Sequence, residues 1–109
     1  MTKHHRLSSS QDFKILFRKG KRIETRLLRI TTLANNLSYA RIALIVPRAI
    51  EKRAVLRNRL RRRVSEWIRR NIAPGLALDI AILFKKESIS SPRKKIYEEL
   101  SKTLGRYNN

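Results

Sequence analysis

Hydrophobic residues recur at helical spacing inside the most basic segment of the chain. In residues 52–70 (KRAVLRNRLRRRVSEWIRR), the apolar positions fall on one arc of a helical wheel: Leu56, Leu60, Val64, Trp67 and Ile68. Most other positions are Arg or Lys. A disordered basic tail has no reason to carry such a stripe. The pattern therefore predicts a helix that packs on a core and turns its cationic side outward.

A second amphipathic pattern predicts a helix over residues 10–19. Three apolar side chains share one face of it: Phe13, Leu16 and Phe17. Ser9 or Ser10 can cap its start, and Gly20 is a typical stop. Two roles stay open for the phenylalanines, as core residues or as an aromatic surface on which a base could rest.

The remaining apolar segments are typical of strands. Residues 21–34 predict one strand or a bent pair, residues 39–46 a strongly apolar and central strand, and residues 76–84 another strand. Serines 88–91 and Pro92, at the first helical position, predict the start of a last helix. Its inner face carries Ile96, Leu100 and Leu104, and it ends at Gly105.

These elements predict an α+β fold in a single small domain of residues 1–109. A central sheet of about four strands packs with three helices in the order α-β-β-β-α-β-α, and residues 1–8 form a flexible basic lead-in. A strand–helix–strand connection between parallel strands is normally right-handed.

The charge of the chain indicates a function. The chain has 109 residues and a net charge of +19, with 27 basic and 8 acidic residues. The excess runs through the whole sequence, and Arg pairs bidentately with phosphate, so nucleic acid is the expected partner. The absence of cysteine fits a reducing, cytoplasmic compartment. No apolar run reaches the roughly 20 residues of a membrane span, so no membrane association is expected.

The sequence carries no recognisable catalytic motif. His4 and His5 form a terminal pair without a sequence-local carboxylate, more typical of an incidental pair than of a metal site. Asp79 lies alone in an apolar strand, where it can cap a backbone group or hold an arginine of the basic helix. We expect a structural role for it, and no catalytic residues or metal ligands in this chain.

Four segments in order resemble the bacterial ribonuclease P protein family. These are RLSSSQDFKILFRKGKR at residues 6–22, RIALIVPR at 41–48, RNRLRR at 57–62 and LDIAILFKK at 78–86. The resemblance spans residues 6–104. It implies a ribosomal-protein-like fold with an unusual left-handed crossover around the basic helix, against the general rule.

The resemblance also implies a function. The protein would join a large catalytic RNA and help it remove the 5′ leader of precursor tRNA. The RNA performs the hydrolysis with Mg²⁺, which it mainly holds itself, and no ion binds tightly to the protein. No protein partner is implied. The residues expected to contact RNA are Arg48, Lys52, Arg53, Arg57, Asn58, Arg59, Arg61 and Arg62, while Phe13 and Phe17 match the floor of the leader cleft.

The chain departs from the family pattern at several positions. Ala43 replaces the strand glycine, Ala49 the second cation after the strand, and Thr31 the strand aromatic of the cleft. In the basic helix, Arg63 and Ser65 also depart. A cleft that lacks one aromatic and one cation would bind the leader more weakly.

Two other hypotheses explain the charge. One is a structural-RNA binding protein of the ribosomal type, without a role in tRNA processing. The other, a cationic protein of membrane surfaces, would need an exposed apolar helix face. The apolar strands instead offer that face a core.

Overall fold

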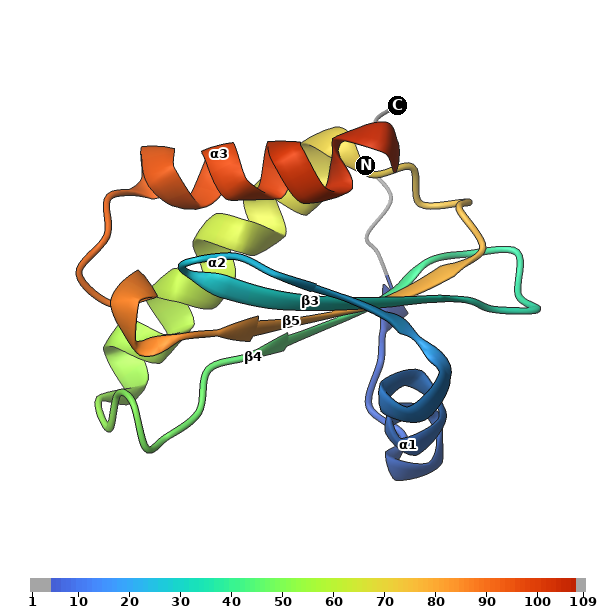
Figure 1. Ribbon diagram of the computed structural model, residues 1–109, viewed down its shortest axis with the longest axis horizontal. Coiled ribbons are helices and arrows are strands. Elements are labelled where there is room, and N and C mark those ends of the chain that lie inside the picture. The colour runs from blue at the N-terminus through green and yellow to red at the C-terminus, as the bar shows by residue number, and fades with distance from the viewer. Residues whose placement is uncertain (1–4, 108–109) are drawn as a thin grey trace.

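A computed structural model describes residues 5–107, which form a five-stranded sheet with helices on both faces (Figure 1). The strands are β1 (His5–Arg6), β2 (Lys21–Glu24), β3 (Leu28–Ala34), β4 (Arg41–Ile45) and β5 (Leu78–Phe84). The helices are α1 (Ser10–Lys19), α2 (Ala54–Asn71) and α3 (Arg93–Leu104). Short 3-10 turns follow β5 and α3, at Lys86–Ser88 and Gly105–Tyr107. The α+β architecture with three helices is as predicted.

The strands lie in the order β1-β4-β5-β3-β2. β1, β4 and β5 are parallel to one another, whereas β3 is antiparallel to both β5 and β2. The central strand is therefore β5. The prediction that the strand within residues 39–46 is central was wrong, because β1 pairs only with Arg41 and Ile42 of β4. The rest of β4 is an edge of the sheet.

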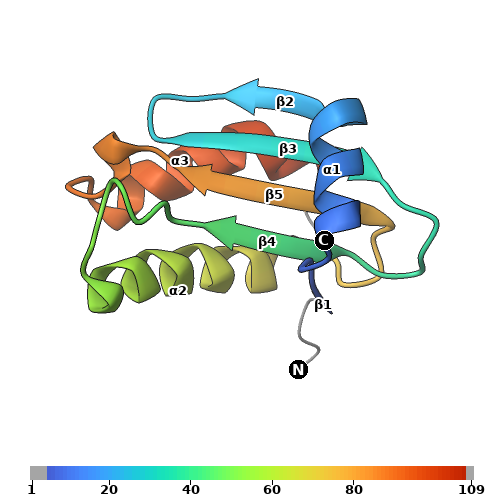
Figure 2. The same cartoon turned by 90° about the horizontal axis from the view of Figure 1, so that it is seen from below.

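The connection from β4 through α2 to β5 is left-handed. Figure 1 shows α2 and α3 on one side of the sheet and α1 on the other. Seen from the α2 side with the parallel strands pointing up, β5 lies to the left of β4 (Figures 1 and 2). The general right-handed rule fails here, and the crossover implied by the resemblance is confirmed.

The main core lies between the sheet and the layer of α2 and α3. The predicted stripe of α2 supplies Leu60, Val64, Trp67 and Ile68, all buried, while Leu56 is only half-buried. α3 contributes its predicted inner face, and the sheet contributes alternate residues such as Ile80 and Ile82. Burial of one stripe per helix leaves the basic residues on the outside.

A smaller cluster fixes α1 to the opposite face of the sheet. It joins Leu7 and Leu16 to Ala43 and Ala81, whose small side chains let the helix approach closely. Gly20 ends α1 as predicted, but its φ of −73° is not left-handed. A Cβ there would lie 2.4 Å from the Leu16 carbonyl oxygen, so the requirement is for space.

Two local predictions need correction, and one alternative that the sequence left open is decided. Residues 5–8 belong to the fold rather than to a flexible lead-in: the Leu7 N–H donates to the Ile42 carbonyl at 2.9 Å. Residues 21–34 form two strands, β2 and β3, which is the bent pair. α3 begins at Arg93, with Pro92 as its cap, because the Ser88 hydroxyl donates instead to the Lys85 carbonyl in a 3-10 turn.

Candidate nucleic-acid interface

The basic residues of α2 are separated from its buried stripe by the helix geometry. Asn58, Arg59 and Arg62 are exposed, whereas Arg57 and Arg61 are half-buried. Arg61 donates to the Asn58 side-chain oxygen at 2.8 Å. Both residues line a hollow between α2 and the edge of β4. The predicted RNA-facing residues of this helix therefore share one end of it.

The loop before α2 is built around Glu51, a buried carboxylate. It accepts hydrogen bonds from the Arg53 guanidinium through both its oxygens, each at 3.0 Å. It also accepts from the Arg53 backbone N–H, again at 3.0 Å. These hydrogen bonds from Arg53 lower the pKa of Glu51 to about 2. Glu51 thus stays ionised and holds the start of the helix in place.

Arg57 has a structural role beside its predicted contact with RNA. Its Nη1 donates to the carbonyls of Glu51 and Lys52, at 3.0 and 2.8 Å. One side of the guanidinium therefore closes the loop, and the rest stays available to a phosphate.

Four of the exposed cations that are predicted to bind RNA have no carboxylate partner in the described part of the chain. Among residues 5–107, no ion pair involves Arg48, Lys52, Arg59 or Arg62. All four are exposed. Neighbouring unpaired cations repel one another, and a polyanion would relieve that repulsion.

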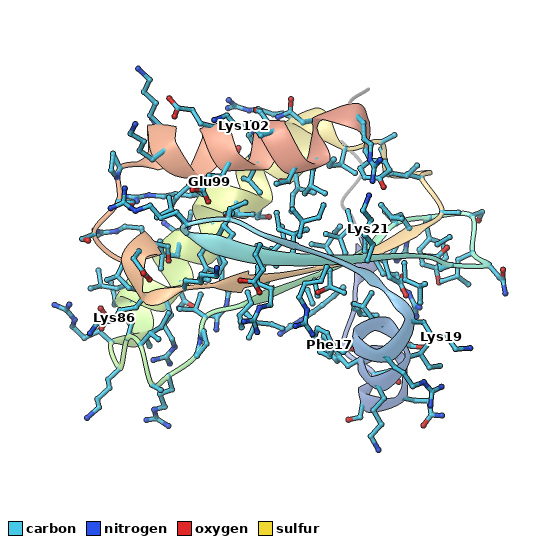
Figure 3. The ribbon with its side chains drawn as sticks, viewed as in Figure 1. Phe17, Lys19, Lys21, Lys86, Glu99 and Lys102 are labelled. Carbon is cyan, nitrogen blue, oxygen red and sulfur yellow. The ribbon has the colours of Figure 1, made fainter. Side chains whose placement is uncertain are left out.

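The second candidate surface is a cleft on the face of the sheet that α1 only partly covers. Figure 2 shows α1 in front of one end of the sheet, whereas no helix lies in front of the strands at the other end. The Phe17 side chain points toward that free surface (Figure 3) and is 47% exposed. The cleft is lined by Phe17, Arg22, Arg29, Thr31, Ile45, Ala81 and Leu83.

The two phenylalanines divide the roles that the sequence left open. Their rings are stacked, with centroids 5.7 Å apart. Phe13 packs against the Leu7–Leu16 cluster, whereas Phe17 is one of two exposed large hydrophobic side chains in the described chain. Phe13 therefore belongs to the core and supports Phe17, whose exposed ring gives the cleft an aromatic surface.

The sequence analysis placed Phe17 and Thr31 at the cleft but missed the rest of its wall. Arg29, Thr31 and Leu83 reach the same face because side chains alternate along β3 and β5. Arg29 is held by an ion pair with Glu24, whose other oxygen contacts Lys85 at 2.7 Å. Hydrogen bonds to Glu24, first from Lys85 and then from Arg29, lower the pKa of its carboxyl group. The alternation was visible in the sequence, but the pairing of these strands was not.

Thr31 packs under the end of α1. It is 3% exposed. A Cβ built on Gly20 would lie only 2.8 Å from its methyl group. Thr31 and Gly20 therefore pack closely where the end of α1 meets the sheet.

An ion-paired network sets the position of α1. Arg41 of β4 donates to Asp79 of β5 at 2.6 and 2.8 Å, and to Asp12 of α1 at 2.8 Å. Asn35 donates to the same Asp79 at 2.8 Å. Hydrogen bonding to Asp79 raises the pKa of Arg41. The structural role predicted for Asp79 is confirmed, but its partner comes from β4 and not from the basic helix.

Metal ligands and membrane-spanning helices were sought among the described residues. No three His, Asp or Glu side chains group together within residues 5–107. The His5 ring lies against Tyr39, with centroids 3.9 Å apart, and His4 lies outside the described residues. No helix in this range is long and apolar enough to cross a bilayer.

Comparisons with known proteins agree with this geometry. The family model described as Ribonuclease P matches residues 1–108. The ribonuclease P protein component of Thermotoga maritima is 33% identical over 103 residues, covering 93% of this chain and 80% of its own length. That of Blochmanniella floridana is 30% identical over 110 residues, covering 100% and 92%.

Solved structures show the same fold. The ribonuclease P protein of Thermotoga maritima superposes with a TM-score of 0.79 at 27% identity, covering 97% of this chain and 100% of that one. The Staphylococcus aureus protein gives a TM-score of 0.81 at 23% identity, covering 98% and 100%.

Proposed function

Because this chain belongs to the ribonuclease P protein component family, we propose that its basic helix binds the catalytic RNA and its cleft binds the 5′ leader of precursor tRNA. As a family member, it is the accessory subunit of an RNA-containing endoribonuclease that processes tRNA. Membership of this family argues against the alternative of a ribosomal-type RNA-binding protein without a role in tRNA processing. We expect the work to take place in the cytoplasm, where precursor tRNA is made.

The proposed division of labour follows the chemistry of the two surfaces. Unpaired arginines at the start of α2 would contact phosphates, which supply affinity without reading sequence. The leader is single-stranded, so its bases are free to stack on Phe17, while Arg22 and Arg29 would contact its phosphates. Ala49 is exposed before α2 and adds no cation there.

Mg²⁺ is proposed to be held mainly by the RNA. The described side chains group no set of ligands that would fit a tight site. The step that cuts the phosphodiester bond is proposed to belong to the RNA, as the family resemblance implies. The protein contributes by positioning the leader and by neutralising phosphates that would otherwise repel one another.

The observation that carries the proposal is the exposed Phe17 ring beside a cleft with two arginines. The test is single-turnover cleavage of a precursor tRNA by bacterial ribonuclease P RNA at low Mg²⁺, with and without this protein. We expect marked stimulation that fades as the leader is shortened.

The other outcomes separate the parts of the proposal. Stimulation that does not depend on leader length would contradict the role of the cleft while keeping the subunit. Tight binding to the RNA without any stimulation would keep RNA binding by the basic helix but contradict a role of this protein in removal of the leader.

A further inference from the structure

A second cationic surface lies between α2 and α3, on the opposite side of the sheet from the cleft. Five basic residues line this α2–α3 groove: Arg62, Arg70, Arg93, Lys94 and Lys102. Figure 3 shows Lys102 on α3, on the side of the sheet opposite to Phe17. Arg62 is shared with the predicted interface, and the other four belong to neither surface assigned above.

The carboxylates of the groove do not balance these cations. Glu66 pairs with Arg69 and lies 3.8 Å from Arg70, while Glu98 lies 3.9 Å from Lys95, which is not among the residues that line the groove. No ion pair within residues 5–107 involves Arg93, Lys94 or Lys102. The groove therefore presents uncompensated positive charge.

The groove has a rigid framework. Tyr97 donates its hydroxyl to the Arg63 carbonyl at 2.9 Å and so joins the two helices. The Arg93 guanidinium lies 6.0 Å from the centre of the Tyr97 ring. Arg62 and Arg70 are eight residues apart on α2, as are Lys94 and Lys102 on α3, which is about 12 Å along each axis. The cations thus lie in two rows, one along each helix.

We propose that this groove is a second RNA-binding surface, which contacts the phosphate backbone of a double-helical RNA segment. This inference rests on the proposed function, because it assumes the same ribonucleoprotein. A duplex suits the groove better than a single strand, since its one aromatic ring is half-buried and already bonded through its hydroxyl. Duplex RNA is recognised mostly through backbone and shape, and cations and Ser101 can supply such contacts.

The first test compares two variants of equal charge in binding to bacterial ribonuclease P RNA over a range of KCl concentrations. The groove variant carries Arg93→Gln, Lys94→Gln and Lys102→Gln. The control carries Lys14→Gln, Arg18→Gln and Lys19→Gln, at exposed positions of α1; Figure 3 shows Lys19 across the sheet from Lys102. All six side chains are exposed, so both variants should fold, which thermal unfolding checks.

The groove variant should flatten the salt slope of log K by about two to three units and bind about 100-fold more weakly at 0.1 M salt. The control should change the slope by less than about one unit. An equal effect of both variants would overturn the proposal, because only net charge would then matter. Wild-type stimulation of cleavage is measured in parallel. If the wild-type protein does not stimulate cleavage, the proposed function is contradicted. If it stimulates cleavage normally but both variants weaken RNA binding equally, only the proposed role of the groove is contradicted.

A second test locates the RNA. The chain has no cysteine, so Ser101→Cys gives a single site for a tethered hydroxyl-radical probe in the groove. Asn36→Cys, in the turn between β3 and β4, is the matched control. We expect probe-dependent cuts on both strands of one helical segment of the RNA, absent from the control. Cuts confined to single-stranded RNA, or identical in both variants, would overturn the duplex assignment.

Discussion

At the scale of single residues, Phe13 and Phe17 differ in what their loss should cost. Phe17 is 47% exposed, so Phe17→Ala should destabilise the protein far less than the about 3–5 kcal/mol of a buried Phe→Ala change. If a leader base stacks on it, the affinity for precursor tRNA should fall by about 1–3 kcal/mol. The measurement is the Kd of the holoenzyme for long-leader and short-leader substrates, together with thermal unfolding.

Phe13→Ala is the matched control for that prediction. Phe13 packs on the cluster under α1, so this variant should lower the unfolding temperature more than Phe17→Ala does. If the Phe17→Ala protein binds both substrates as tightly as the wild type does, no leader base stacks on Phe17.

The Arg41–Asp79 pair gives a second prediction at this scale. Asp79 has a side chain only 6% exposed, and Asp79→Asn would leave the charge of Arg41 without its main partner. We expect a loss of about 3–5 kcal/mol in the free energy of unfolding. Arg41→Met combined with Asp79→Asn should cost less than the sum of the single changes, since neither charge is then stranded. Additive losses in denaturant unfolding would show that the pair is not coupled.

Residue-level roles were predictable from the sequence only in part. The exposure of the α2 cations followed from periodicity, and a structural role for Asp79 followed from its isolation in an apolar strand. Its partner did not, because the contact depends on Arg41 lying opposite Asp79 in the β4–β5 register. The bonds from Arg57 to the carbonyls of the preceding loop were equally hidden, since no pattern fixes that loop.

At the scale of elements, the start of α2 should depend on the charge of Glu51. Its folded pKa of about 2 lies below the ordinary value of 4.5. A lowered pKa contributes stability that is fully present above about pH 4.5 and is lost as the pH falls toward 2. Glu51→Gln cannot titrate, so its stability deficit relative to wild type should shrink across this window. Denaturant unfolding between pH 2 and 6 measures it, and a constant deficit would exclude the ionic contribution.

Element boundaries were predictable where side-chain patterns set them. α1 matches its prediction at both ends, because a serine cap and a glycine that must lack a side chain fix it. β1 was missed, since two residues are too few for a periodic pattern and Leu7 is buried only once α1 has docked. The start of α3 was misplaced because several serines can cap, and those at 88 and 91 bond to carbonyls instead.

At the scale of the whole molecule, the order of strands and the left-handed crossover lay beyond local reasoning. The pattern of apolar residues predicted one sheet with helices, and the general rule for parallel strands favoured a right-handed connection. The crossover came from the family resemblance alone. It matters for function, because it puts α2 beside the β4 edge and the cleft on the opposite face of the sheet. The protein can therefore face RNA on more than one side.

The net charge of +19 makes a final prediction in which salt has opposite effects on folding and on binding. Like charges on one compact surface oppose folding, and added salt screens them, so KCl should raise the unfolding temperature of the free protein. The same salt should weaken RNA binding, because counterions released from the phosphates gain less free energy when they enter a more concentrated salt solution. Thermal unfolding and RNA titration over the same KCl series measure both. A free protein whose unfolding temperature falls with KCl would mean that internal ion pairs, such as Arg41 with Asp79, outweigh the repulsion of the surface cations.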